Sequence, residues 1–128
     1  MKTIIIMGSI SDEPHAKKIT DKLDEYKIAW QQHAASAHKQ PLKVLEILEA
    51  NKDQKDIIYI TIAGRSNALS GFVAANSEFP TIGCPPFSDK SDMLVNIHST
   101  LQMPSQTPVL TVIDPGNCAL AVKRIFGV

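Results

Sequence analysis

The sequence predicts an α/β fold: a doubly wound parallel sheet with helices on both faces, in three αβα layers. Two observations lead to this prediction. Short β-branched apolar runs alternate along the chain with segments of helical periodicity, and the alternation occurs five times. Because parallel strands are joined by crossovers that are usually helices, five strand–helix units imply one parallel sheet. Right-handed crossovers then favour the flavodoxin-like strand order 2-1-3-4-5.

The five apolar runs are the expected strands. They cover residues 3–7, 28–34, 57–62, 81–84 and 109–113. The third run is β-branched and almost continuously hydrophobic, which is typical of a strand that is buried on both faces. We therefore expect this strand to lie inside the sheet.

The expected helices follow the strands. They cover residues 14–26, 41–50, 67–76, 93–101 and 117–126. The first has a typical start, with a capping residue at Asp12 and a proline in the first turn at Pro14. In the second, Val44, Leu45 and Leu48 are expected to face the sheet.

Composition fits a single globular domain over residues 1–128, with 44% hydrophobic and 20% charged residues. Thirteen basic and thirteen acidic residues cancel, which argues against a nucleic-acid or membrane partner but not against one bound phosphate. The apolar start of the chain is too short for a signal peptide or a membrane span. Cys84 and Cys118 lie far apart in the sequence and are interpreted as free thiols. These features predict a cytoplasmic protein.

Three polar loops are expected to form a ligand site. In an open α/β sheet, ligands bind beyond the carboxyl ends of the strands, at the switch in strand order, which here lies between the first and third strands. The loops at residues 8–12, 36–39 and 63–68 should therefore converge.

The first of these loops combines Gly8, Ser9 and Asp12 with the start of a helix. Free amides and hydroxyls in such a place can bind an anion or a polyol, and a plain helix cap explains the same residues equally well. Asp12 only accepts hydrogen bonds and would repel a phosphate, so ribose hydroxyls suit it better.

The second loop contains Ser36, His38 and Lys39. His38 is the only histidine in the three loops, and histidine is the side chain that exchanges a proton most readily near neutral pH. Lys39 supplies a point charge for a phosphate. We therefore predict that His38 is the proton-transfer residue.

The third loop contains Arg65, Ser66, Asn67 and Ala68 at the start of a helix. Amides near Ser66, Asn67 and Ala68 could hold a carboxylate or CO2. The alternative is that these residues only cap the helix, with Arg65 exposed. This alternative is less favoured, because three polar loops meet at one switch point.

No cofactor is expected. His15, His33 and His98 show no metal-ligand spacing. The sequence also lacks both the Walker A tract and the GxGxxG pattern of nucleotide-binding proteins. We predict an activity that needs neither a metal nor an organic cofactor.

Three tracts form a specific set that spans the chain: Gly8-Ser9-x-Ser11-Asp12, Ser36-Ala37-His38 and Gln102-Met103-Pro104. This set resembles the PurE family, which comprises aminoimidazole ribonucleotide (AIR) carboxylases and N5-carboxyaminoimidazole ribonucleotide mutases. Mutases usually carry an arginine after the histidine and an Ala-His-Leu-Pro-Gly tract after the third strand. This chain has Lys39 and a tract at residues 63–71 that resembles the second class, the AIR carboxylases.

The resemblance implies an enzyme of purine biosynthesis that adds CO2 to C4 of AIR. It implies that His38 moves protons, that Ser9, Asp12, Ser36, Lys39 and Ser66 bind ribonucleotide or CO2, and that the protein is a homo-oligomer, an octamer by the family pattern. The mutase reaction is the alternative within the family. A non-catalytic flavodoxin-like nucleotide-binding module is the alternative outside it.

Overall fold

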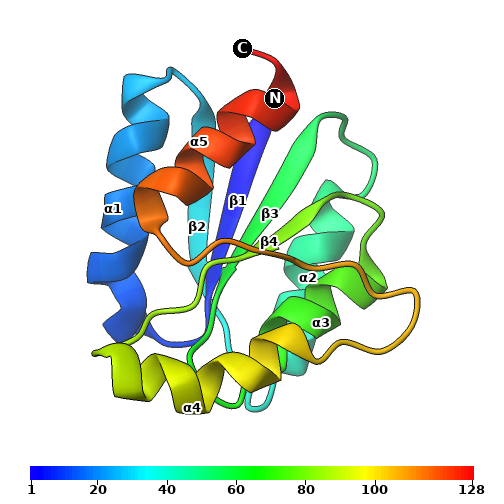
Figure 1. The fold of residues 1–128 in the computed structure, drawn as a ribbon. Helices are drawn as coiled ribbons and strands as arrows, with labels where there is room; N and C mark the ends of the chain where they lie inside the picture. Colours follow the sequence, from blue (N-terminus) through cyan, green and yellow to red (C-terminus); the bar gives the residue numbers. More distant parts are fainter.

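The computed structural model describes residues 1–128 and contains one parallel sheet of five strands in the order β2-β1-β3-β4-β5 (Figure 1). The strands are β1 Lys2–Met7, β2 Ala29–Ala34, β3 Ile57–Ile62, β4 Thr81–Gly83 and β5 Leu110–Thr111. The predicted strand order is therefore confirmed. β1 lies between β2 and β3, in register along all six of its residues.

Helices cover both faces of the sheet. They are α1 Glu13–Glu25, α2 Pro41–Asn51, α3 Leu69–Asn76, α4 Lys90–Leu101 and α5 Pro115–Phe126, and a short 3-10 turn, η1 Ile10–Asp12, precedes α1. The helices α1 and α5 pack on one face and α2 and α3 on the other (Figure 1). No helix in the structure is both long and apolar enough to cross a bilayer.

Side-chain caps explain why two helices begin earlier than expected. Asp89 accepts a hydrogen bond from the amide of Asp92 at 2.8 Å, so α4 begins at residue 90 rather than 93. Asp114 does the same for the amide of Asn117 at 2.8 Å, so α5 begins at residue 115. Each carboxylate satisfies one of the amides that a helix start leaves without a partner.

The inward face of α2 differs from the prediction. Val44, Ile47 and Leu48 are buried, whereas Leu45 is 39% exposed. Residues three and four apart share one side of a helix, and the stripe through Val44 and Ile47 leaves Leu45 at its margin. The prediction that Leu45 faces the sheet was wrong.

The central strand β3 is buried along its whole length, as its hydrophobicity predicted. Its Tyr59 is fully buried, and burial raises the pKa of Tyr59 to about 12. The hydroxyl groups of Thr3, Tyr59 and Thr81 are buried without a hydrogen-bond partner. All three lie on the strands, away from the loops at the carboxyl end of the sheet.

Candidate active site

The loops that follow β1, β2 and β3 meet at the carboxyl end of the sheet, as the switch in strand order requires. They enclose a cavity of about 290 Å³. Every predicted site residue except Asn67 lines this cavity. The structure therefore brings these residues together, while their individual roles remain predictions.

The first loop presents a carboxylate to the cavity. Ser9 caps the η1 turn, since its hydroxyl accepts a hydrogen bond from the amide of Ser11 at 3.2 Å. Asp12 occupies the cap position of α1 but makes no side-chain hydrogen bond there, so its carboxylate is available to a ligand. Burial raises the pKa of Asp12 above its usual 3.8, and the charge of His15 and the nearby backbone of Ser9 offset part of this effect.

The second loop orients His38. Ser36 closes a tight turn, with its hydroxyl accepting from the amide of Lys39 at 3.2 Å and its carbonyl from the amide of Gln40 at 2.7 Å. The Nε2 atom of His38 lies 3.2 Å from the carbonyl oxygen of Ser66. A carbonyl can only accept, so Nε2 carries the proton, and in the neutral ring Nδ1 is then the free acceptor.

Two amides of the third loop are already hydrogen-bonded within the protein. The amide of Asn67 donates to the hydroxyl of Ser99 at 2.9 Å, and the amide of Ala68 donates to the carbonyl of Ser66 at 2.9 Å. The peptide bond between Arg65 and Ser66 is cis. Of the amides near Ser66, Asn67 and Ala68 that were predicted to hold a carboxylate or CO2, those of Asn67 and Ala68 already have partners, while the role of the Ser66 amide stays a prediction.

The side chain of Asn67 also points away from the cavity. Asn67 is 5% exposed, and its Nδ2 donates to Ser70 Oγ at 2.8 Å and to Thr100 Oγ1 at 2.9 Å. The prediction that Asn67 binds substrate is therefore corrected: its side chain supports the loop from behind the cavity. Nothing in the sequence separates Asn67 from its polar neighbours, since its partners lie up to 33 residues away.

Two cations at the cavity form no ion pair. Lys39 and Arg65 are both exposed, and the three ion pairs of the protein join other residues on α1 and at α2. Arg65 also contributes, after the hydrogen bonds from Ser88, to holding the pKa of Asp92 below its usual 3.8. Two unpaired positive charges beside one carboxylate suit an anionic ligand that also carries hydroxyl groups.

Several lining residues were not predicted to bind a ligand. Ala37, Ala63 and Leu69 form the apolar part of the cavity wall together with Ala68. They carry no chemistry of their own, so the only signal available was their position beside the polar residues.

His15 is one of the histidines that show no metal-ligand spacing in the sequence, and its Nε2 lies 3.0 Å from the carbonyl oxygen of Cys84. His15 thus ties α1 to the loop after β4, beside the Asp12 carboxylate whose pKa it lowers. No three residues among His, Cys, Asp and Glu are placed to hold a metal ion.

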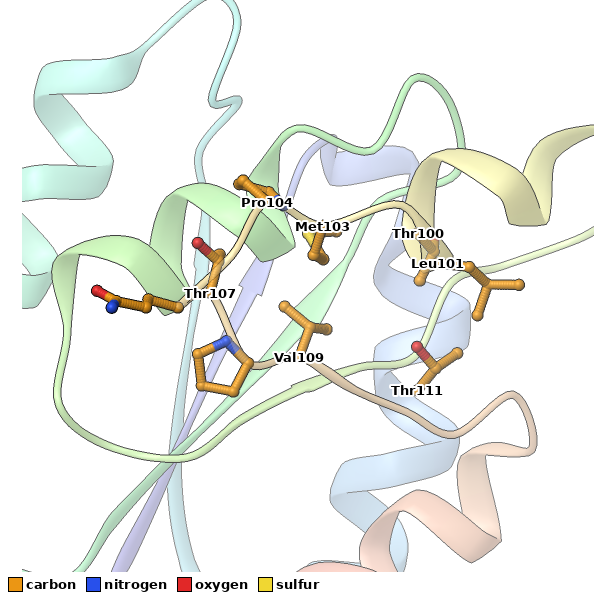
Figure 2. Close-up of a pocket in the computed structure, with 9 residues that line it drawn as sticks. Thr100, Leu101, Met103, Pro104, Thr107, Val109 and Thr111 are labelled. Atoms are coloured by element: carbon orange, nitrogen blue, oxygen red, sulfur yellow. The ribbon is translucent and has the colours of Figure 1, made fainter.

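A second hollow, of about 450 Å³, lies between the end of α4 and the β5 segment (Figure 2). Its lining is made by side chains such as Thr100, Met103 and Val109, and it contains no charged or titratable group. Proton transfer and anion binding both need such groups, so this hollow does not suit that chemistry.

The fold and the cavity together define a class of protein: a doubly wound flavodoxin-like α/β domain that has a histidine and unpaired cations at the switch in strand order. The family model described as AIR carboxylase matches residues 2–128. The chain belongs to this family, the PurE family of purine biosynthesis, and the resemblance that the motifs suggested is confirmed.

Relatives match along almost the whole chain. The phosphoribosylaminoimidazole carboxylase of Archaeoglobus fulgidus is 48% identical over 126 residues, covering 98% of this chain and 69% of that protein. The protein of the same name from Treponema denticola is 46% identical over 124 residues, covering 96% of this chain and 77% of that protein. The crystal structure of Treponema denticola PurE superposes with a TM-score of 0.94 at 44% identity, covering 98% of this chain and 80% of that one.

Proposed function

We propose that this protein is a phosphoribosylaminoimidazole carboxylase, which adds CO2 to C4 of AIR to give carboxyaminoimidazole ribonucleotide. The observation that carries the proposal is the imidazole of His38, held by the Ser66 carbonyl inside a cavity with two unpaired cations. The names of the Archaeoglobus fulgidus and Treponema denticola relatives support the same reaction.

The proposed reaction needs little more than orientation and one proton transfer. The aminoimidazole ring is an enamine, so C4 is nucleophilic and attacks the carbon of CO2 without a cofactor. A C–C bond forms, one C–O π bond becomes a carboxylate, and the proton on C4 leaves to restore the aromatic ring. Nδ1 of His38 accepts that proton in our proposal, because Nε2 is committed to Ser66.

The other cavity residues would bind and orient the substrate. Lys39 and Arg65, which both line the cavity, would hold the phosphate and stabilise charge that develops on the new carboxylate. Asp12 would accept hydrogen bonds from ribose hydroxyls, while Ser9, Ser36 and Ser66 offer further polar contacts. Holding CO2 beside C4 in this way would provide much of the acceleration.

Substrate choice tests the proposal. The protein is incubated with AIR and bicarbonate, and separately with N5-carboxyaminoimidazole ribonucleotide, while product absorbance is followed. Bicarbonate-dependent turnover of AIR supports the carboxylase. Turnover of the N5-carboxylated compound alone would establish the mutase instead, and binding of either compound without turnover would indicate a nucleotide-binding module.

Replacing the proposed base should abolish most activity. We expect His38→Asn to keep the fold and bind AIR but to lose at least about a hundredfold in kcat, the lower end of what a positioned acid–base group contributes. His98→Asn is the matched control, since His98 is exposed on α4 outside the cavity, and it should behave like the wild type. If kcat of His38→Asn stays within a few-fold of the wild-type value, His38 only orients the substrate and does not transfer the proton.

We also propose a cytoplasmic homo-oligomer, an octamer by the family pattern, that works without a metal. Exposed apolar side chains on α4, Leu94, Val95 and Leu101, support self-association. Light scattering that finds a fully active monomer would contradict the assembly. Activity that disappears with a chelator and returns with one particular metal would contradict the absence of a cofactor.

A further inference from the structure

A chain of hydrogen bonds connects α4 to the carbonyl that holds His38. The peptide unit between Ser66 and Asn67 contains both the Ser66 carbonyl and the Asn67 amide. The carbonyl oxygen lies 3.2 Å from His38 Nε2, and the amide donates to Ser99 Oγ at 2.9 Å. Since a trans peptide unit is planar and points its carbonyl and amide in opposite directions, Ser99 at one end controls the direction in which the carbonyl faces at the other.

The hydroxyl of Ser99 is held in the accepting role that this arrangement needs. It donates its own proton to the carbonyl of Asn96, one turn earlier in α4, at 3.2 Å. Its lone pair is therefore left for the amide of Asn67, 32 residues away in the chain. The hydrogen bond between α4 and the loop has a defined direction.

The side chain of Asn67 fixes the same peptide unit from a second side. Both protons of Nδ2 have partners, Ser70 Oγ at 2.8 Å and Thr100 Oγ1 at 2.9 Å, and Oδ1 accepts from the amide of Ser70 at 3.1 Å. Asn67, Ser70 and Thr100 are all buried, so each of these bonds is costly to break.

This network has little freedom to shift. Ser70 Oγ is also 2.7 Å from the hydroxyl of Thr61 in the fully buried strand β3. A methyl group added at Gly83 in β4 would lie 3.1 Å from Ser70 Oγ and 3.5 Å from a methyl of Thr100. The strand β4 therefore packs directly against the network. Figure 2 shows Thr100 near the end of α4, where it lines the uncharged hollow, and Thr100 does not line the cavity of the three loops.

We propose that Asn67 and Ser99 are positioning residues, which set the orientation and the tautomer of the His38 imidazole through the Ser66–Asn67 peptide unit. Neither side chain lines the cavity, and each acts only by fixing the carbonyl that accepts from Nε2. The kinetic consequence rests on the proposed carboxylase reaction, while the effect on the imidazole does not.

The first experiment measures the ring itself. In protein labelled with 15N at histidine, the two ring nitrogens of His38 report which one carries the proton in the neutral form. We expect the wild type to show the Nε2–H tautomer, Ser99→Ala to show a mixture, and Ser99→Thr, which keeps the hydroxyl, to resemble the wild type. Ser91→Ala, at an exposed serine on the same helix, is the control. Ring signals in Ser99→Ala identical to those of the wild type would overturn the proposal.

The second experiment measures turnover of AIR. We expect Ser99→Ala to lower kcat by about tenfold, because a slightly misplaced base transfers protons less well, with KM changed by less than about threefold. Ser99→Thr should restore kcat, and a value for Ser99→Ala within about twofold of wild type would contradict the proposal. If the wild type does not turn over AIR at all, the proposed function fails, and the ring measurement still decides the positioning role.

A second pair of variants separates positioning from general damage to the core. Thr100→Val removes the hydroxyl that Asn67 donates to, whereas Thr81→Val removes a buried hydroxyl that has no partner. We expect only Thr100→Val to mix the tautomers of His38 and lower kcat. Equal effects from both variants would show that the loss comes from the core and would overturn the proposal.

Discussion

The helices α4 and α5 have the same length, twelve residues each, and attach to the same sheet in different ways. The inner side of α5 is apolar, with Cys118, Ala119 and Val122 buried against α1 and the strands. In α4 only Thr100 is buried, while Leu94 and Val95 are 65% and 70% exposed.

The difference separates two kinds of attachment. The hydrophobic effect that holds α5 depends on area and hardly on direction, so α5 stabilises the fold without fixing any atom of the site. The hydrogen bonds that hold α4, through Ser99 and Thr100 to Asn67, are directional and end beside His38. We infer that α5 contributes mainly to stability and α4 mainly to the geometry of the cavity.

The largest expected change in the free energy of unfolding comes from the apolar core that holds α5. Leu23 of α1 is fully buried in the core that α1 and α5 share, so Leu23→Ala should lower the free energy of unfolding by about 2–5 kcal/mol. The matched substitution on α4, Leu94→Ala, should change the free energy of unfolding of the dissociated chain by no more than about 0.5 kcal/mol, because that side chain is 65% exposed in the single chain. Urea denaturation of both variants measures the difference. A similar loss from both would mean that α4 has an apolar attachment after all.

A smaller loss is expected from breaking the polar attachment. Ser70→Ala removes a partner from both Thr61 and Asn67 inside the protein, which should cost about 1–3 kcal/mol. Ser91→Ala, at an exposed position of α4, serves as the reference and should stay within about 0.5 kcal/mol of wild type. Should Ser70→Ala be as stable as the reference, the network would contribute no stability and the comparison of the two helices would fail.

The smallest expected effect concerns acid. Hydrogen bonds from Ser88 hold the pKa of Asp92, near the start of α4, below its usual 3.8. The charged carboxylate therefore stabilises the folded state above pH 3.8, and this contribution is lost as the pH falls through the lower folded value.

Hydrogen exchange below pH 3.8 should thus show the first turn of α4 opening before the first turn of α5, and Asp92→Asn should remove the pH dependence of that opening. If the two helices open together in the wild type, Asp92 does not set the acid stability of α4.

Much of the fold could be predicted because its signal is local. The apolar runs and helical periods identified all ten main elements, and the strand order followed from the handedness of the crossovers. The place of the cavity followed from the same order, since the switch in a doubly wound sheet determines which loops converge.

What could not be predicted depends on partners far away in the sequence. Asn67 and Ser66 are both polar residues of one loop, yet Ser66 lines the cavity and Asn67 is buried against α4. The choice between them is made by Ser99 and Thr100, more than 30 residues later, and no pattern within the loop encodes it. In the same way, the exposure of Leu45 depends on how α2 is rotated against the sheet.

The unpartnered hydroxyls of Thr3, Tyr59 and Thr81 have a practical consequence for protein engineering. Each is a desolvated polar group without a partner. The substitutions Thr3→Val, Tyr59→Phe and Thr81→Val remove the hydroxyl and nearly keep the shape of the side chain. All three lie on strands, away from the loops that form the cavity, so a protein with these three substitutions should be more heat-resistant with its cavity intact. A sturdier parent tolerates more of the destabilising loop substitutions that directed evolution needs when it alters which ribonucleotide an enzyme accepts.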